Sequence, residues 1–256
     1  YRPAFVDSLK LDFGNHTLHL PPPPAMGGLA AAQAYAMAEE LGFDGAGTAD
    51  GAHRLLAAWT RALSERRAYL DTPAADRPDP AALLADAHIE ARVDDVAADA
   101  ATPANRLAPP PRALAEDAKT AGFAVADRFG NMVACDFTMN GLFGSGRRAG
   151  NTGLLLAGRQ PVEAAGAGLA PALISNANTG SSYFAASAAG GPAGQTALVG
   201  LLPGLDIGYD NANLSALVNA ARLHHPGEPD TVLAEPDVAA DVLSGLRRRG
   251  YRVERE

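Results

Sequence analysis

An expected β-hairpin in the middle of the sequence constrains the fold of this chain more than any other feature. The segments 120–126 and 132–138 read as strands, and the five residues between them, D-R-F-G-N, have the composition of a turn. If R-F-G forms a three-residue loop with Gly130 in the left-handed conformation, the two strands pair in one defined register. In that register Thr120 lies directly opposite Thr138.

The two facing threonines admit two interpretations. A hydroxyl at the start of a strand, opposed by a second hydroxyl, has what a nucleophile with a hydrogen-bond partner needs. Threonine is also common in strands because its β-branched side chain suits extended backbone. Periodicity alone therefore favours a structural role for Thr120 and Thr138, and only the surrounding sequence can favour a catalytic one.

Helices and a second strand pair are expected around the hairpin. The strand pair covers 173–175 and 182–187, and the glycine-rich bend 190–194 leads into a helix. Residues 96–118, rich in Ala, Pro and Asp, read as a loose surface connector. Apolar periodicity and end signals predict helices at 29–41, 53–70, 79–93, 195–202, 214–223 and 237–249.

The composition argues against several classes of protein. The chain has 256 residues, 47% of them hydrophobic, which is ample for one or two packed cores. A net charge of −8 argues against nucleic acid or an anionic membrane as a partner. The single cysteine excludes an intramolecular disulfide. No stretch reaches the roughly 20 apolar residues that span a bilayer. The sequence starts as if in mid-protein, so the absence of a secretory signal leaves the cytoplasm, the periplasm and the extracellular space open.

Three blocks of sequence resemble one known family. Residues 120–156, TAGFAVADRFGNMVACDFTMNGLFGSGRRAGNTGLLL, resemble the start of the small subunit of the gamma-glutamyltransferase (gamma-glutamyl transpeptidase) family. The run PPPPAMGG at 21–28 is similar to the family's P-P-P-x-x-G-G, and NAARLHH at 219–225 is similar to its N-A-P-R-x-H-H. Positions in register within the first block are Asp127, Gly130, Asn131, Thr138, Asn140, Phe143, Gly144, Gly153, Leu155 and Leu156.

The resemblance implies the fold and the organisation of the chain. It implies an α/β fold, the four-layer helix–sheet–sheet–helix sandwich of the N-terminal-nucleophile hydrolases, truncated at both ends relative to the family. Residues 1–119 would be the C-terminal part of a large-subunit-like region that ends in a mobile connector. Residues 120–256 would be the small-subunit-like catalytic region, intertwined with the first part in one domain. The implied protein partners are the large and small fragments of one precursor and a dimer of such heterodimers.

The resemblance also implies a catalytic mechanism. Autocatalytic cleavage of a zymogen between Lys119 and Thr120 would free the α-amine of Thr120, which then serves as general base for its own hydroxyl. Thr138 would orient that hydroxyl, and Asn140 would contact the substrate or the nucleophile's amine. The implied substrate is a small-molecule amide or acyl compound, and no cofactor or metal is implied.

An oxyanion hole is implied at the glycine-rich bend. The run GGPAG at 190–194 is similar to the family's G-S-P-G-G, whose last two backbone amides form that hole. Here these would be the amides of Ala193 and Gly194. Without the resemblance, the same run reads as an ordinary glycine-rich helix entry.

The sequence departs from the family pattern where the substrate's charged groups bind. The family's N-N-Q-x-D, whose Gln and Asp hold the α-amino group of a γ-glutamyl substrate, is replaced by AGRQP, which includes Arg159. The paired serines that bind the α-carboxylate become Ala167 and Gly168. A buried ammonium without a carboxylate partner is costly. We therefore expect Arg159, Ala167 and Gly168 to form an altered substrate pocket that does not prefer glutathione.

Three functions remain open at this point. The first is an autoprocessing amidohydrolase or acyltransferase with a threonine nucleophile. The second is a family member that cleaves an unusual bond, carbon–carbon for example, in secondary metabolism. The third is an inactive binding scaffold. The sequence has no phosphate-binding G-x-x-x-x-G-K-[ST] and no H-E-x-x-H motif. The adjacent His224 and His225 point apart on one element, so they are not expected to bind a metal together.

Overall fold

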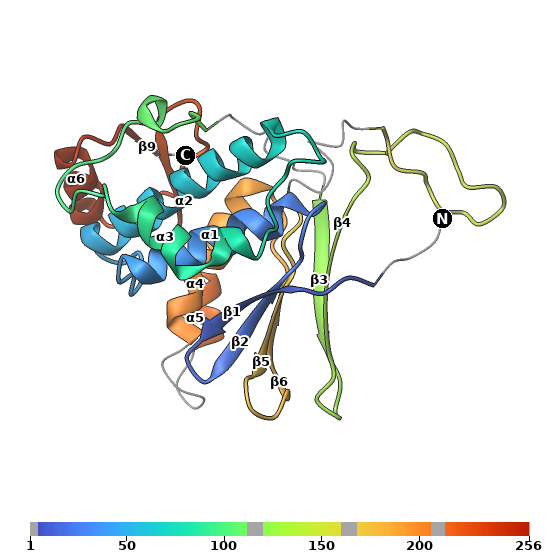
Figure 1. Ribbon diagram of the computed structural model, residues 1–256. Coiled ribbons are helices and arrows are strands. Elements are labelled where there is room, and N and C mark those ends of the chain that lie inside the picture. Colours follow the sequence, from blue (N-terminus) through green and yellow to red (C-terminus); the bar gives the residue numbers. More distant parts are fainter. Residues whose placement is uncertain (1–4, 112–119, 160–167, 206–212, 256) are drawn as a thin grey trace. The chain divides into compact units, whose positions relative to one another are not determined.

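The computed structural model describes residues 5–111, 120–159, 168–205 and 213–255 and divides into two compact units. The first contains Tyr1–Leu29 and Ala115–Gln195, and the second contains Ala30–Leu114 and Thr196–Glu256. Each unit thus draws on sequence from both sides of the Lys119–Thr120 bond, and the expected division at residue 120 stays a prediction. Figure 1 shows the strands β1 to β6 of the first unit and most of the helices in the second.

The hairpin in the first unit has the register that the sequence predicts. Strands β3 (Thr120–Ala126) and β4 (Met132–Thr138) are antiparallel, with Thr120 opposite Thr138. The loop closes through the Asp127 N–H, which donates to the Asn131 carbonyl at 3.0 Å. Gly130 has φ 84°, the left-handed conformation that this loop requires. Turn chemistry therefore sets the register, as expected.

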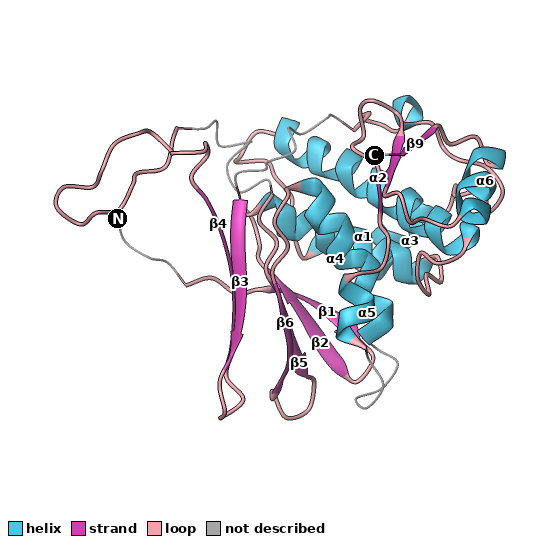
Figure 2. Cartoon of the chain, turned by 180° about the vertical axis from the view of Figure 1, so that it is seen from behind, coloured by secondary structure: helices cyan, strands magenta, loops and turns pink. Residues whose placement is uncertain are grey.

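A second antiparallel sheet in the first unit has the strand order β1-β2-β5-β6. The β3–β4 hairpin lies against β6 and β5, as Figure 2 also shows. The buried face of this sheet includes Leu18, Leu20 and Ile174. We did not predict the first two strands, although apolar residues alternate there and a two-residue turn joins them. The strands are β1 (Leu9–Phe13), β2 (His16–Leu20), β5 (Ala172–Asn176) and β6 (Ser182–Ala186).

Helices predominate in the second unit, which also holds a small sheet. A hydrophobic core joins α2 and α6 to three short strands, in which β7 and β8 are antiparallel and β8 and β9 are parallel. Its buried members include Leu56, Val242, Leu246 and Val253. The elements are α2 (Ala49–Asp71), η1 (Ala82–Leu84), α3 (Asp86–Val93), η2 (Ala104–Arg106), α5 (Leu214–Val218), β7 (Leu223–His224), β8 (Val232–Ala234), α6 (Ala240–Arg248) and β9 (Val253–Arg255), and α1 (Met26–Glu40) and α4 (Pro192–Leu205) enter this unit from the first.

Four of the six expected helices are present with shifted ends, and two predictions were wrong. The helix expected at 79–93 is split into η1 and α3, because Asp79 closes a turn on Ala81 and Ala85 is extended, with ψ 141°. The helix expected at 214–223 ends at Val218. Its expected last residue, Leu223, instead pairs with Ala234 in a sheet that local sequence does not reveal.

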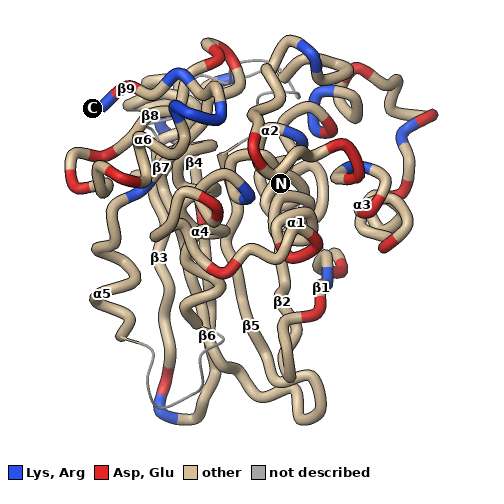
Figure 3. Tube along the Cα trace, turned by 90° about the vertical axis from the view of Figure 1, so that its left-hand side faces the viewer, with Lys and Arg blue, Asp and Glu red and all other residues tan. Residues whose placement is uncertain are grey.

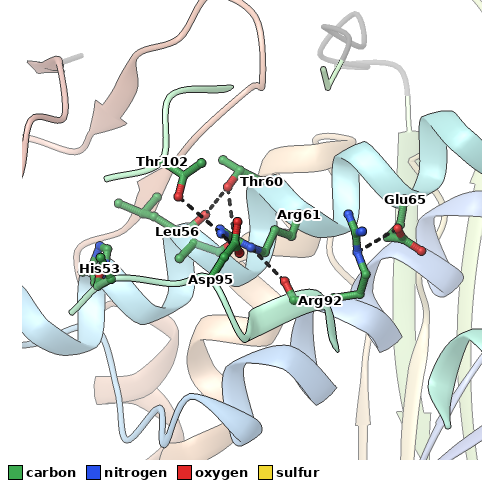
Figure 4. A network of polar contacts seen from close by, with 10 residues as sticks. His53, Leu56, Thr60, Arg61, Glu65, Arg92, Asp95 and Thr102 are labelled. Carbon is green, nitrogen blue, oxygen red and sulfur yellow. Dashed lines mark hydrogen bonds and ion pairs between the residues drawn. The ribbon is translucent and has the colours of Figure 1, made fainter. Parts of the chain in front are cut away.

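The connector expected at 96–118 is not loose over its described part, which ends at residue 111. The guanidinium of Arg61, almost fully buried on α2, binds the Asp95 carboxylate at 2.7 Å and the Thr102 hydroxyl at 3.3 Å (Figure 4). The Ala104 N–H donates to the Asp230 carboxylate at 3.0 Å. These contacts between distant residues order the segment, and Ala104 and Leu107 are buried.

Candidate active site at the head of the hairpin

Thr120 and Thr138 lie on the same face of the hairpin because they are direct register partners. Both are partly buried. The opposite face carries Phe123 and Phe137, whose rings lie 6.4 Å apart and whose surfaces are about half exposed. The expected pairing of the two threonines is therefore confirmed, and both belong to the face on which the small residue Gly122 also lies.

Asn140 continues the site directly after β4. Its backbone N–H donates to the Thr138 hydroxyl oxygen at 3.0 Å, and its φ of 54° is in the left-handed region, which asparagine tolerates better than most residues. Its side-chain amide donates to the Gly158 carbonyl at 3.0 Å. Asn140 thus binds Thr138 through its backbone and holds the end of the following loop through its side chain.

The loop after β4 returns to the site and places Arg159. Residues 141–157 form the long excursion that Figure 1 shows beyond the end of β4. The loop closes where the Gly158 N–H donates to the Met139 carbonyl at 2.7 Å. Arg159 follows at once and is exposed. Arg159, which we expected to bind the substrate, is therefore the residue after Gly158, whose carbonyl Asn140 holds. The other expected residues Ala167 and Lys119 lie outside the described residues.

The glycine-rich bend reaches the hydroxyl of Thr120. The Gly190 N–H donates to Thr120 Oγ1 at 3.1 Å, across 70 residues of sequence. Gly190 and Gly191 have φ values of 107° and 63°, which residues with a side chain rarely adopt, and Pro192 then begins α4. Sequence reasoning missed Gly190, although it is the first glycine of the bend that was singled out.

The two amides expected as oxyanion donors lie in the first turn of α4. Helix geometry leaves the N–H groups of this turn without an acceptor inside the helix. Ala193 and Gly194 are the second and third residues of α4. A Cβ at Gly194 would come within 2.6 Å of the Ala189 carbonyl oxygen, so the bend folds tightly back on this turn.

Gly168 also lies close to Thr120. It is buried, and a Cβ at this position would lie 2.8 Å from Gly191 Cα and 3.7 Å from Thr120 Cγ2. A contact of 2.8 Å is shorter than packed carbon atoms allow. The structure therefore brings the expected Gly168 to the site and leaves little room there for a side chain.

Asp136 is a site residue that sequence reasoning missed. It is partly buried on β4, its Oδ1 accepts a hydrogen bond from the Ser187 hydroxyl, and its Oδ2 accepts one from the Ala170 N–H at 3.0 Å. Burial raises the pKa of this carboxyl, and the two hydrogen bonds partly offset the effect. An isolated acidic residue in an apolar strand was the available sequence signal.

The two adjacent histidines have separate contacts in the second unit. The His224 ring lies 2.9 Å from the Thr196 hydroxyl, and the His225 ring lies 3.1 Å from the Asp230 carboxylate. Among the residues that the structure describes, no group of three or more His, Cys, Asp or Glu is placed to hold a metal ion. No helix in the described ranges is long and apolar enough to cross a membrane.

Comparison with known proteins defines the class to which this fold and site belong. The model of the gamma-glutamyltranspeptidase family matches residues 1–161, so the chain belongs to that family. It is 25% identical over 269 residues to the glutathione hydrolase proenzyme of Escherichia coli K12, covering 94% of this chain and 46% of that protein. It is 27% identical over 281 residues to the glutathione hydrolase proenzyme of Pseudomonas aeruginosa, covering 99% of this chain and 50% of that protein. The chain thus spans about half the length of these curated relatives.

A solved structure supports the same fold. The crystal structure of a cephalosporin acylase from Bacillus halodurans matches all of this chain and 47% of its own, with a TM-score of 0.77 and 22% identity. The expected N-terminal-nucleophile hydrolase fold, mixed in helix and sheet and partial relative to its relatives, is therefore confirmed.

Proposed function

We propose that this chain carries the catalytic part of an autoprocessing amidohydrolase or acyltransferase in which Thr120 is the nucleophile. The single observation that carries the proposal is the Gly190 N–H, 3.1 Å from Thr120 Oγ1, at the head of a hairpin where Thr138 faces Thr120. A backbone N–H aimed at a hydroxyl oxygen stabilises the negative charge that develops there as the proton leaves. A threonine with only a structural role in a strand does not need such a donor.

Processing would begin with Thr120 Oγ1 attacking the carbonyl carbon of Lys119. The C–N bond to Thr120 breaks, the hydroxyl proton passes to the departing nitrogen, and an ester joins Lys119 to Oγ1. Water then hydrolyses the ester, which leaves a carboxylate on Lys119 and restores the Thr120 hydroxyl beside the α-amine that the first step freed. With an unperturbed pKa near 8, that amine can serve as the base for its own hydroxyl in each later turnover.

Turnover would follow the same path with a substrate carbonyl in place of Lys119. Thr120 forms an acyl-enzyme, the leaving amine takes a proton from the α-ammonium, and water releases the acyl group. The amides of Ala193 and Gly194 are the proposed oxyanion donors, because they lie in the first turn of α4, where backbone N–H groups have no helical acceptor. Removing one donor from such a hole typically costs about 3 kcal/mol in the barrier.

The substrate is proposed to differ from an ordinary γ-glutamyl amide. Gly168 packs against Thr120 and Gly191, where a serine hydroxyl would otherwise meet the substrate. Arg159 follows Gly158, whose carbonyl accepts from the Asn140 side chain, and offers a permanent positive charge, which favours an anionic or carbonyl-rich acyl group. The Bacillus halodurans structure of similar fold is that of a cephalosporin acylase, which supports an acyl group other than γ-glutamyl.

The intact mass of the full-length protein that contains this chain tests the proposal. The wild type should separate into two fragments that meet at Lys119–Thr120, and Thr120→Ala should remain one chain. Thr17→Ala is the matched control, because Thr17 lies in β2 and pairs with Ser175, away from the hairpin. A wild-type protein that stays intact after long incubation, or a Thr120→Ala protein that still separates, refutes the proposal.

A further inference from the structure

Asp136 is the only charged residue in either strand of the hairpin. Asp127 and Arg128 lie in the turn between the two strands, where Figure 3 shows both acidic and basic colour. Asp136 is two residues before Thr138, so both side chains are on the face that carries Thr120. Its carboxyl group therefore lies beside the site, where an apolar residue would be less costly to bury.

The carboxyl group of Asp136 joins two segments that both contact Thr120. Oδ1 accepts from Ser187, which is three residues before Gly190, the donor to Thr120. Oδ2 accepts from the N–H of Ala170, which is two residues after Gly168. Since Asp136 itself is on a strand of the hairpin, one carboxyl group ties three pieces of chain together next to the nucleophile. We call Asp136, Ser187 and Ala170 the carboxyl clamp.

Gly122 makes room for the clamp. It is the register partner of Asp136, and a Cβ at this position would overlap both Asp136 Oδ1 and Ser187 Oγ and would come within 2.8 Å of the Cys135 carbonyl oxygen. Any side chain larger than hydrogen would push Ser187 away. Because residue 122 is glycine, the hairpin leaves space for the Ser187 hydroxyl, which comes from a distant segment of the chain.

We propose that Asp136 is a positioning residue, which acts through Ser187 to hold the Gly190 amide against Thr120 Oγ1. The inference rests on the proposed function, because it assigns this contact a role in processing and turnover. Burial of the carboxyl group, which raises its pKa, works against stability at neutral pH. The hydrogen bonds from Ser187 and Ala170 offset part of that cost, and they hold the segment that leads to the bend.

The positioning role predicts different results for Asp136→Asn and Asp136→Ala. In Asp136→Asn the amide oxygen can accept from Ala170 while the NH₂ group donates to Ser187, whose hydroxyl rotates to accept. Both links of the clamp then survive without the charge. In Asp136→Ala both links are lost, and in Ser187→Ala one is lost with less disturbance of the hairpin.

The experiment uses the full-length protein and two measurements. The first is the half-time of fragment appearance by intact mass. The second is amide hydrogen–deuterium exchange at Gly190, by mass spectrometry of peptides that cover the bend, after incubation long enough for processing to finish. Asp127→Ala is the matched control: it removes a carboxylate from the same hairpin at the opposite end, where Asp127 accepts from Asn131 and Phe129 in the turn.

We expect Ser187→Ala and Asp136→Ala to raise exchange at Gly190 and to slow processing by about tenfold or more, because each loses at least one hydrogen bond to a charged group. Asp136→Asn should stay within about threefold of the wild type in both measurements, since it keeps both links. Asp127→Ala should leave both unchanged. If Asp136→Ala does not fold, Ser187→Ala still tests the link that reaches the bend.

The outcomes separate the two proposals. If Ser187→Ala leaves Gly190 exchange unchanged, or if Asp136→Asn is as defective as Asp136→Ala, the positioning role is wrong. If Thr120→Ala still separates into fragments, the proposed function is wrong, but exchange at Gly190 still reports whether the clamp holds the bend.

Discussion

The hydroxyl of Thr138 is the clearest place to test whether the hairpin orients Thr120, the proposed nucleophile. Thr138→Val keeps the β-branched shape that suits a strand and removes the hydroxyl, whose oxygen accepts from the Asn140 N–H at 3.0 Å. We expect a stability loss of about 0.5–1.5 kcal/mol for one net hydrogen bond. The Asn140 backbone, held at φ 54°, also loses the contact that favours this conformation.

The effect on processing should exceed the effect on stability. One positioned hydrogen bond near a reacting group accounts for about 1–3 kcal/mol of activation free energy, so Thr138→Val should slow fragment formation by roughly 5- to 150-fold. Thr138→Ser keeps the hydroxyl and should process close to the wild-type rate. Thr17→Val, in β2, is the control for replacing a strand threonine.

The assay is the half-time of fragment appearance from the purified precursor, with thermal unfolding measured on the same samples. Processing of Thr138→Val at the wild-type rate would refute the orientation argument. So would Thr138→Ser that is as slow as Thr138→Val, because the hydroxyl would then be irrelevant.

Three further predictions concern substrate, packing and pH. Glutathione and γ-glutamyl-p-nitroanilide should be poor substrates in steady-state assays; kcat/KM of about 10⁴ M⁻¹s⁻¹ or more for either would show that other residues rebuild the pocket. Gly168→Ser should slow processing and lower the melting temperature rather than create glutathione hydrolysis, because its Cβ would lie 2.8 Å from Gly191 Cα; a variant that gains that activity would contradict this. Burial lowers the pKa of His225 below its usual 6.5, so its neutral form stabilises the protein above that pH, and this contribution is lost as the pH falls through the folded pKa. His225→Gln should therefore lose less stability than the wild type when the pH falls below 6.5. Unfolding can be measured by fluorescence of the single tryptophan, Trp59, whose side chain donates to the His225 carbonyl; an unchanged pH profile would count against this prediction.

Local chemistry was enough to predict the hairpin and its facing threonines. The loop length and the left-handed requirement at Gly130 leave one register, and a period of two then determines which side chains share a face. The same kind of local signal placed α2 and α6, whose apolar residues recur at helical spacing. The motif pattern around Thr120 indicated the family before any contact was known.

Only the tertiary structure decided which groups meet at Thr120. The Gly190 amide is 70 residues away in sequence and Ser187 is 51 residues from Asp136, so no periodicity or turn rule relates them. The same reason explains the failed helix at 214–223, where pairing of Leu223 with Ala234 replaces local helical preference. Sequence alone predicted the hairpin, its facing threonines and most of the helices, because these depend on neighbours along the chain. The contact of the Gly190 amide with Thr120, the carboxyl clamp and the tight packing of Gly168 depend on neighbours in space, which the packed fold alone brings together.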